Sequence, residues 1–224
     1  MFCPGCNADS LVKTRSGSPA CDFICGSCNE RYELKSGKRT VAGRIPDSAY
    51  GAMVAAIRND KTPNLLAMQY SPALQVLNLL LIPRYFFTES VIEKRPPLSL
   101  NARRAGWVGC NILLNRIPAD GQIPVVINGV ASNKANVREQ FARAKALTQL
   151  SVPERGWTVD VLNGVHDLGR KEFTLVEAYS LEGYLTDLHP KNRHVRAKIR
   201  QQLQVLRDLG FLQFLGDGRY RFRY

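Results

Sequence analysis

Residues 21–36, CDFICGSCNERYELKS, contain two short strand-like stretches joined by a turn that carries cysteines. Successive side chains of a strand point to opposite faces, so Glu33 and Lys35 project from one face and Leu34 from the other. A hairpin can place Asp22 opposite them, because facing residues of paired strands have Cβ atoms about 5 Å apart. We therefore expect Asp22, Glu33 and Lys35 to form one site.

Two carboxylates beside an ammonium group suit a hard divalent cation and an activated water. Mg²⁺ prefers oxygen ligands, so Asp22, Glu33 and the carbonyl of Leu34 are expected to hold one or two Mg²⁺ ions. Such a site indicates hydrolysis of a phosphodiester bond, with Lys35 orienting and helping to deprotonate the attacking water, or stabilising the transition state. The E-x-K triplet alone is weak evidence, since exposed strands often carry Glu and Lys.

The same stretch carries half of a second metal signature. Four cysteines form two C-x-x-C motifs, Cys3-Pro-Gly-Cys6 and Cys25-Gly-Ser-Cys28. Eighteen residues separate the motifs, a spacing typical of a four-thiolate structural zinc site. Two disulfides in a secreted protein are the alternative, but the chain starts without a signal-peptide pattern, so we expect a cytoplasmic protein. The second motif lies between Asp22 and Glu33, so zinc is expected to support the catalytic hairpin.

The net charge of +12 is unevenly distributed. Nine Lys or Arg and only two Asp fall between residues 190 and 224. A solvated basic face is one explanation, but such clustering favours a polyanionic partner. No apolar run approaches the length needed to cross a bilayer, so no membrane partner is expected.

The chain is expected to form an α/β (α+β) nuclease domain with a zinc ribbon over residues 1–149 and a winged helix-turn-helix domain over residues 150–224. Pro, Gly and charged residues replace periodicity in LSVPERG, residues 150–156, at this boundary. In the first part, strands are predicted at 65–70, 74–83, 107–114 and 123–127, and helices at 49–59, 88–94 and 136–150. Residues 46–48, PDS, offer a start signal for the first of these helices. In the second part, helices are predicted at 157–167, 174–188 and 192–209, followed by a two-stranded wing at 211–224.

The third helix of the second part separates into two faces. Its apolar positions recur at helical spacing and should pack inward: Val195, Ile199, Leu203 and Leu206. The opposite side is basic, and the residues expected to contact DNA there are Asn192, Arg193, Arg196 and Arg200. In the wing, Arg219, Arg221 and Arg223 should face phosphate while Tyr220, Phe222 and Tyr224 pack inward. Trp157, at the start of an apolar-periodic helix, is expected in the core.

Several segments together resemble the family of DpnI-like methyl-directed restriction endonucleases. They are CPGC, DFICGSC, YELKSGK, NARRAGWVGCN, RGWT, EFTL and KIRQQLQVLRD. The resemblance extends from about residue 2 to the C-terminus. It implies a PD-(D/E)xK nuclease domain with a zinc element, followed by a winged-helix domain. It also implies Mg²⁺-dependent cleavage of double-stranded DNA at GATC when the adenines carry an N6-methyl group, with both domains recognising the methylated site.

The resemblance assigns roles to individual residues. Asp22, Glu33 and Lys35 take the catalytic positions, and the zinc ligands are Cys3, Cys6, Cys25 and Cys28. Arg103, Arg104 and Trp107 match a DNA-contacting ARRAGW segment. A Trp beside arginines can wedge against a base step while the guanidinium groups grip the backbone, although a core Trp with two surface arginines is the plainer interpretation. The family has a segment upstream of the first cysteine motif, so the number of bound metal ions stays open.

Two other functions remain open from the sequence. One is a non-catalytic regulator that combines a winged helix with a zinc ribbon and reads methylated DNA. The other is an RNA-associated zinc-ribbon protein, which the winged helix argues against because A-form major grooves exclude side chains. We expect the protein to act as a monomer, although one catalytic site per chain suggests either transient pairing or sequential nicking of the two strands. The sequence leaves open the oligomeric state, the exact site, the need for methylation of both strands and the form of the cut.

Overall fold

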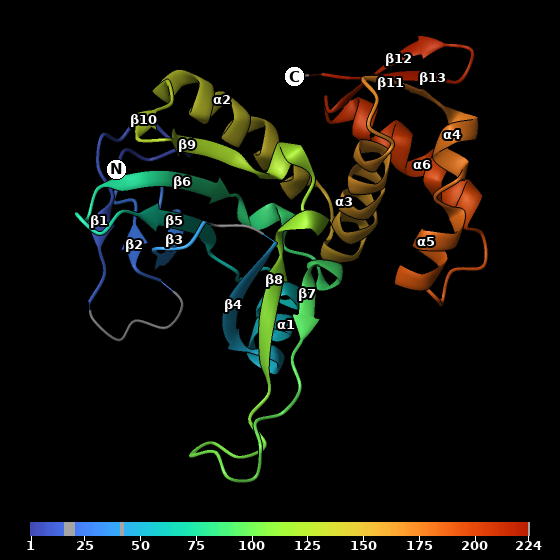
Figure 1. Ribbon diagram of the computed structural model, residues 1–224. Helices are drawn as coiled ribbons and strands as arrows, with labels where there is room; N and C mark the ends of the chain where they lie inside the picture. Colours follow the sequence, from blue (N-terminus) through green and yellow to red (C-terminus); the bar gives the residue numbers. More distant parts are fainter. Residues whose placement is uncertain (16–20, 41–42, 224) are drawn as a thin grey trace. The chain divides into compact units, whose positions relative to one another are not determined.

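The computed structural model describes residues 1–15, 21–40 and 43–223. The chain divides into two compact units, Met1–Lys145 and Ala146–Tyr224. Each unit has its own set of buried apolar side chains. Figure 1 shows the first unit in blue to yellow-green and the second in brown to red.

A seven-stranded sheet forms the main layer of the first unit, in the order β1-β2-β3-β5-β6-β9-β10. Its strands are β1 (Val12–Lys13), β2 (Phe23–Ile24), β3 (Arg31–Gly37), β5 (Asn64–Tyr70), β6 (Val76–Ile82), β9 (Ile123–Ile127) and β10 (Val130–Ala131). β3 and β5 run parallel, while the other neighbouring pairs are antiparallel. β3 lies between β2 and β5 and pairs with both, so hydrogen bonds on its two sides fix the register of its residues.

The strands predicted from apolar runs are present. β5 buries Leu65, Leu66 and Ala67 in succession, as expected for a strand covered on both faces. Asn128 and Gly129 both have positive φ, at 49° and 81°, in the two-residue turn between β9 and β10. That conformation suits Asn-Gly in a tight hairpin, as the sequence indicates.

Helix α2 (Lys134–Lys145) covers one face of this sheet and lies along β9 in Figure 1. Its buried side chains are Val137, Phe141 and Ala144, at helical spacing. Short 3₁₀ turns occupy Arg84–Phe86, Glu89–Val91, Leu114–Arg116, Ala119–Gly121 and Ala146–Gln149. The predicted helix at 88–94 is therefore one 3₁₀ turn followed by a strand.

A second sheet in this unit has three strands in the order β4-β8-β7. They are β4 (Arg44–Ala49), β7 (Ile92–Lys94) and β8 (Gly109–Leu113). Helix α1 (Tyr50–Arg58) follows β4 directly and buries Met53, Val54 and Ile57. The interpretation of residues 46–48 as a helix start is wrong, because Asp47 pairs with Cys110 in the β4–β8 ladder.

The second unit is a helix-turn-helix with a β-hairpin wing. Its elements are α3 (Val152–Asp167), β11 (Glu172–Thr174), α4 (Leu175–Tyr179), α5 (Glu182–Leu188), α6 (Val195–Asp208), β12 (Leu212–Gly216) and β13 (Arg219–Phe222). The three strands form a sheet in the order β11-β13-β12. Inside the unit, the Thr158 hydroxyl on α3 donates a 2.6 Å hydrogen bond to the Gln202 side chain on α6. The four apolar positions predicted to pack inward on α6 are all buried.

Three helix boundaries differ from expectation. α3 begins at Val152 rather than 157, because Ser151 and Glu154 form a capping box and Pro153 fits the first turn. The single helix expected at 174–188 is broken into α4 and α5, where Leu181 packs against Gly164 of α3 and leaves no room for a Cβ there. α6 begins at Val195, so Asn192 and Arg193 precede the helix.

The fold class predicted from the sequence is confirmed as a mixed α/β unit followed by a helix-turn-helix unit. None of the helices in the described part of the chain is long and apolar enough to cross a membrane.

Candidate active site and metal centre

The β2–β3 hairpin places Asp22 against β3. In its ladder Phe23 pairs with Tyr32, and the backbone N–H of Asp22 donates a 2.9 Å hydrogen bond to the Tyr32 carbonyl. The Asp22 side chain then reaches along β3, where its Oδ2 accepts a 2.7 Å hydrogen bond from the backbone N–H of Leu34. Asp22 therefore lies directly beside the strand that carries Glu33 and Lys35.

Glu33 and Lys35 project from the same face of β3 and contact each other. Nζ of Lys35 lies 2.5 Å from Oε1 of Glu33. Their side chains are only 17% and 29% exposed, respectively, so water screens this pair weakly. The three residues expected to form one site are thus brought together on one hairpin and the strand that continues it.

Burial and neighbouring charges shift both of these groups. Burial raises the pKa of Glu33, and the carboxylates of Asp47 and Asp22 add to the rise, while Lys35 opposes it. Burial lowers the pKa of Lys35, but its contacts with the carboxylates of Asp47 and Glu33 outweigh that effect, so its pKa is raised. These contacts therefore favour the charged, ammonium form of Lys35.

Asp47 is a third carboxylate at this site that the sequence did not reveal. Its Oδ1 lies 2.6 Å from Nζ of Lys35, and its side chain is only 3% exposed. It reaches the site from β4, a strand of the other sheet. Its position in a PDS triplet resembles a helix start, and nothing local in the sequence indicates the pairing with Lys35.

A groove of about 460 Å³ adjoins Lys35. Its polar and basic lining comes from Lys35, Ser36, Arg39, Thr40 and Arg44. Apolar side chains form the remainder of the wall: Leu34, Ile45, Pro46, Ala67 and Met68, with the backbone of Gly37 between them. Cationic side chains around a groove next to carboxylates suit a phosphodiester that approaches the acidic site.

The four cysteines of the two C-x-x-C motifs form one cluster, as the spacing predicts. Their Sγ atoms all lie within 4.8 Å of one another, and both measured pairs, Cys3–Cys28 and Cys6–Cys25, are 3.6 Å apart. A disulfide would require about 2.05 Å. Four sulfurs about 2.3 Å from a central Zn²⁺ would be separated by nearly 3.8 Å in a tetrahedron. The cluster therefore fits a closed structural zinc site.

The thiols of the cluster have different surroundings: burial raises the pKa of Cys3 and of Cys28. Burial raises the pKa of Cys25, but the backbone N–H groups of Cys28 and Ser27 outweigh it and lower that pKa to about 6. Around the cluster, the Arg138 guanidinium on α2 donates to the carbonyls of Cys3 and Ala8, each at 3.3 Å. The thiolate form that zinc requires is thus favoured at Cys25.

Tyr32 connects the cysteine cluster to the acidic site. Its side chain is fully buried, with the hydroxyl 3.5 Å from Sγ of Cys3. Its carbonyl accepts the hydrogen bond from Asp22. Tyr32 therefore contacts the cysteine cluster through its side chain and Asp22 through its backbone. This is the connection that the sequence predicts between the cysteine cluster and the hairpin.

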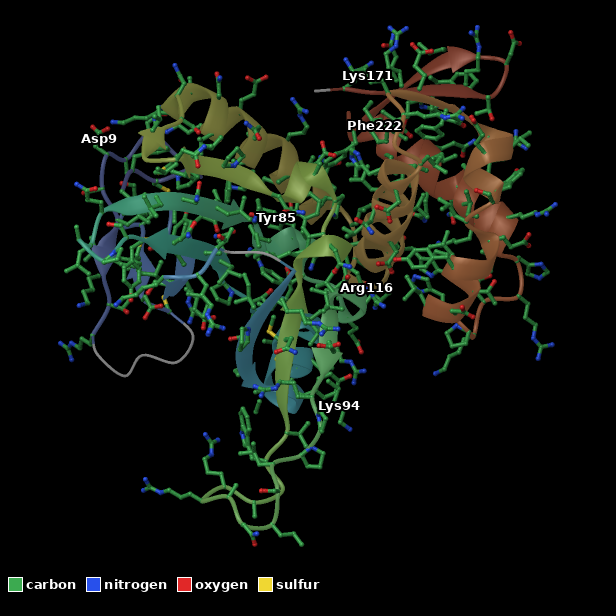
Figure 2. The ribbon with its side chains drawn as sticks, in the orientation of Figure 1. Asp9, Tyr85, Lys94, Arg116, Lys171 and Phe222 are labelled. Atoms are coloured by element: carbon green, nitrogen blue, oxygen red, sulfur yellow. The ribbon has the colours of Figure 1, made fainter. Side chains whose placement is uncertain are left out.

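The loop between β7 and β8 carries the ARRAGW segment and projects away from the rest of its unit in Figure 1. Figure 2 labels Lys94 at its base and shows nitrogen-tipped side chains beyond it. Arg103 and Arg104 are exposed, and the Arg104 guanidinium lies 4.6 Å from the centroid of the Trp107 ring. Trp107 is half-buried and packs on Gly109, where an added Cβ would lie 2.7 Å from the ring. The loop thus presents a cation stacked on an aromatic ring.

The basic residues of the second unit lie mostly at its surface. Arg193, Arg200 and Arg219 are exposed. Arg196 and Arg221 are exposed too, but they pair with Glu182 at 2.6 Å and with Glu172 at 2.7 Å. Tyr220 and Phe222 are buried between exposed arginines on β13, as the alternation predicts, while Tyr224 lies outside the described residues.

Both units match family models. Residues 1–150 match the model named DpnI and described as the Dam-replacing family, and residues 153–222 match the Dam-replacing HTH domain. The chain belongs to the DpnI family. This is a family of restriction endonucleases, so the resemblance drawn from the sequence motifs is confirmed.

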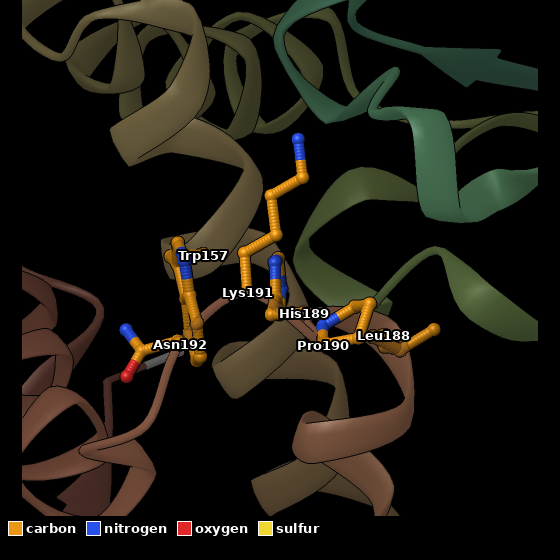
Figure 3. Close-up of a pocket in the computed structure, with 6 residues that line it drawn as sticks. All are labelled: Trp157, Leu188, His189, Pro190, Lys191 and Asn192. Atoms are coloured by element: carbon orange, nitrogen blue, oxygen red, sulfur yellow. The ribbon is translucent and has the colours of Figure 1, made fainter.

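One feature of the second unit differs from the expectation for a DpnI-family helix-turn-helix core. Trp157 is half-buried rather than a core residue, and its ring stacks on His189 with centroids 3.7 Å apart. Nε2 of His189 lies 2.8 Å from Oδ2 of the buried Asp160. Figure 3 shows the two rings face to face in a pocket of about 450 Å³ lined by Trp157, Leu188, His189, Pro190, Lys191 and Asn192. The apolar periodicity of this helix predicts that Trp157 faces inward. It does not show whether the ring is enclosed in the core or lines a pocket.

Proposed function

We propose that this DpnI-family protein is a type II, methyl-directed endonuclease that cleaves double-stranded DNA at sites containing N6-methyladenine, of the Gm6ATC kind. The observation that carries the proposal is the proximity of Asp22, which directly precedes β2, to Glu33 and Lys35 on β3. Membership of a family of restriction endonucleases supports cleavage of DNA as the reaction. The helix-turn-helix unit is suited to binding duplex DNA.

The acidic site has the donors that Mg²⁺ requires. Asp22, Glu33 and the Leu34 carbonyl would hold the ion, because carboxylate and carbonyl oxygens are its preferred ligands. A bound Mg²⁺ would supply Lewis-acid stabilisation of the charge that develops on the phosphate. The cysteine cluster would hold Zn²⁺ in a structural role, since four thiolates leave no open position for substrate.

Lys35 would act as the fixed cation of the reaction. Its raised pKa keeps the ammonium charged, so it can donate to a phosphate oxygen or orient the attacking water. The water oxygen loses a proton to solvent and forms a bond to phosphorus, while the bond from phosphorus to the 3′ oxygen breaks and that oxygen takes up a proton from solvent. The partly buried surroundings of Lys35 strengthen its interaction with the charge that develops in this step.

DNA would be held by basic residues of both units. On the second unit these are Asn192, Arg193, Arg196, Arg200, Arg219 and Arg221, before and along α6 and on the wing. On the first unit they are Arg103 and Arg104, with Trp107 placed to contact a base step. A single methyl group adds only about 0.8 kcal/mol of burial, so recognition of methyladenine needs a shaped pocket rather than area alone. We infer a monomer that cuts the two strands in turn.

The test is digestion of one plasmid prepared in fully methylated and unmethylated forms, with sequencing of the products. We expect Mg²⁺-dependent cleavage of the methylated form only, with ends that map to GATC. A methyl-reading regulator without nuclease activity would bind the methylated plasmid and leave it intact. Equal cleavage of both forms would contradict methyl dependence while retaining the nuclease.

A further inference from the structure

Asp47 is a buried carboxylate with an incompletely satisfied oxygen. Its side chain is only 3% exposed. Among the buried side-chain oxygens and nitrogens of the described residues, Oδ1 of Asp47 is the one that lacks a hydrogen bond of normal geometry. Its charge is opposed at 2.6 Å by the Lys35 ammonium. A buried carboxylate is costly for folding unless an opposite charge offsets it, and the charge that offsets Asp47 is the lysine of the proposed active site, which points to a functional role.

Lys35 bridges two carboxylates that have different surroundings. Glu33 shares β3 with Lys35 and belongs to the set proposed to hold Mg²⁺, while Asp47 comes from the other sheet. If Glu33 held a cation, its oxygens would be less available to the Lys35 ammonium. Asp47 then remains as the protein carboxylate that holds the Lys35 ammonium in place.

The strand that carries Asp47 is also attached to the root of the ARRAGW loop. β4 pairs with β8 along its length, with Asp47 opposite Cys110 and Ala49 opposite Gly109. One residue further, the backbone N–H of Tyr50 donates a 3.0 Å hydrogen bond to the carbonyl of Val108, which follows Trp107. The loop proposed to contact DNA and the carboxylate that contacts Lys35 therefore sit on one ladder.

We propose that Asp47 is a positioning residue for Lys35. Through Asp47, the position of this lysine would depend on β4, which pairs with the strand that follows the ARRAGW loop. The inference rests on the proposed nuclease function. Asp47 touches neither substrate nor metal in this scheme; it sets where the ammonium lies relative to the phosphate.

Single-turnover cleavage of a methylated duplex by Asp47→Asn tests the proposal. We expect the rate to fall about 10- to 100-fold, as for the loss of an outer-shell partner. The Kd for the same duplex, measured without Mg²⁺, should stay within about twofold of the wild-type value, because no phosphate contact is lost. The melting temperature should fall modestly at most, because Lys35 keeps its ion pair with Glu33 at 2.5 Å.

Two further variants separate positioning from a structural role. Asp47→Glu keeps the charge on a longer side chain and should recover part of the lost rate. In a Lys35→Met background, Asp47→Asn should have no further effect on the residual rate, because both changes act through one lysine. Glu89→Gln, which removes an exposed ion pair with Arg58 in the same unit, is the matched control and should leave the rate unchanged.

The outcomes distinguish this inference from the function on which it rests. A wild-type rate in Asp47→Asn, full additivity with Lys35→Met, or a rate loss in a protein that is no longer folded at the assay temperature would each overturn the positioning role and leave the nuclease standing. Failure of the wild-type protein to cleave methylated DNA in Mg²⁺ would overturn both.

Discussion

The hydroxyl of Tyr32 lies 3.5 Å from Sγ of Cys3, so one buried side chain touches the cysteine cluster from the strand that leads into the acidic site. The carbonyl of the same residue accepts a hydrogen bond from the backbone of Asp22. The cysteine cluster is therefore joined to the proposed catalytic hairpin by a continuous set of contacts, and we expect loss of zinc from the cluster to affect the acidic site.

Removal of zinc is expected to abolish cleavage even with Mg²⁺ in excess. Structural zinc contributes about 10–16 kcal/mol of apparent binding free energy in small domains, which exceeds the stability of many folded proteins. Cys25→Ser should lose zinc by elemental analysis and lose ordered β-structure by circular dichroism. Cys110→Ala, which removes a buried cysteine outside the cluster, should keep its zinc. Full cleavage after proven loss of zinc would rule out a supporting role for the metal.

Tyr32→Phe should weaken zinc binding about tenfold, in the range found when an outer-shell partner of a metal ligand is removed. The ring still fills its buried site, so the melting temperature of the zinc-loaded protein should change little. Competition with a chelator of known affinity measures the effect. An unchanged zinc affinity would show that the Tyr32 hydroxyl does not act on Cys3.

Binding to duplex DNA should weaken steeply with salt, because each neutralised phosphate releases counterions. Arg219→Ala should lower the slope of log K against log salt by about 1. Arg221→Ala should have a smaller effect, because Arg221 already pairs with Glu172 at 2.7 Å. A titration of Kd against salt for the wild type and both variants gives the comparison. A flat salt response in the wild type would exclude the electrostatic docking proposed for α6 and the wing.

The capping box at the start of α4 predicts a pH-dependent part of stability. The backbone N–H and hydroxyl of Thr174 donate to Glu177 and lower its pKa below the ordinary value of 4.5. The charged form is favoured in the folded state, so this contribution is present above pH 4.5 and is lost as pH falls through the lower folded value. Glu177→Gln should flatten the fall of melting temperature between about pH 5 and pH 3. An unaltered pH profile in this variant would contradict the assignment.

Much of this architecture is encoded locally and could be predicted. The spacing of the two C-x-x-C motifs predicts the cysteine cluster, and the alternation of RYELKS predicts that Glu33 and Lys35 share a face. The apolar periodicity of α6 predicts its buried side, because helix faces depend on near neighbours in the sequence.

The remaining features depend on contacts between residues far apart in the chain. Asp47 meets Lys35 only because two sheets converge, and its local PDS sequence resembles a helix start. The break between α4 and α5 depends on Leu181 reaching Gly164 on another helix. Ion pairs such as Arg196–Glu182 likewise join separate elements, so a list of basic residues could not show which guanidinium groups are already engaged.

The most direct test of the nuclease proposal is the single-turnover cleavage rate of Lys35→Ala on a Gm6ATC duplex, measured together with its Kd. Removal of one preorganised donor is expected to reduce the rate about 100- to 1000-fold. The Kd should stay near the wild-type value, because the arginines of α6, the wing and the ARRAGW loop are untouched. A Lys35→Ala protein that binds and cleaves the methylated duplex like the wild type would contradict the assignment of Asp22, Glu33 and Lys35 as the cleavage site.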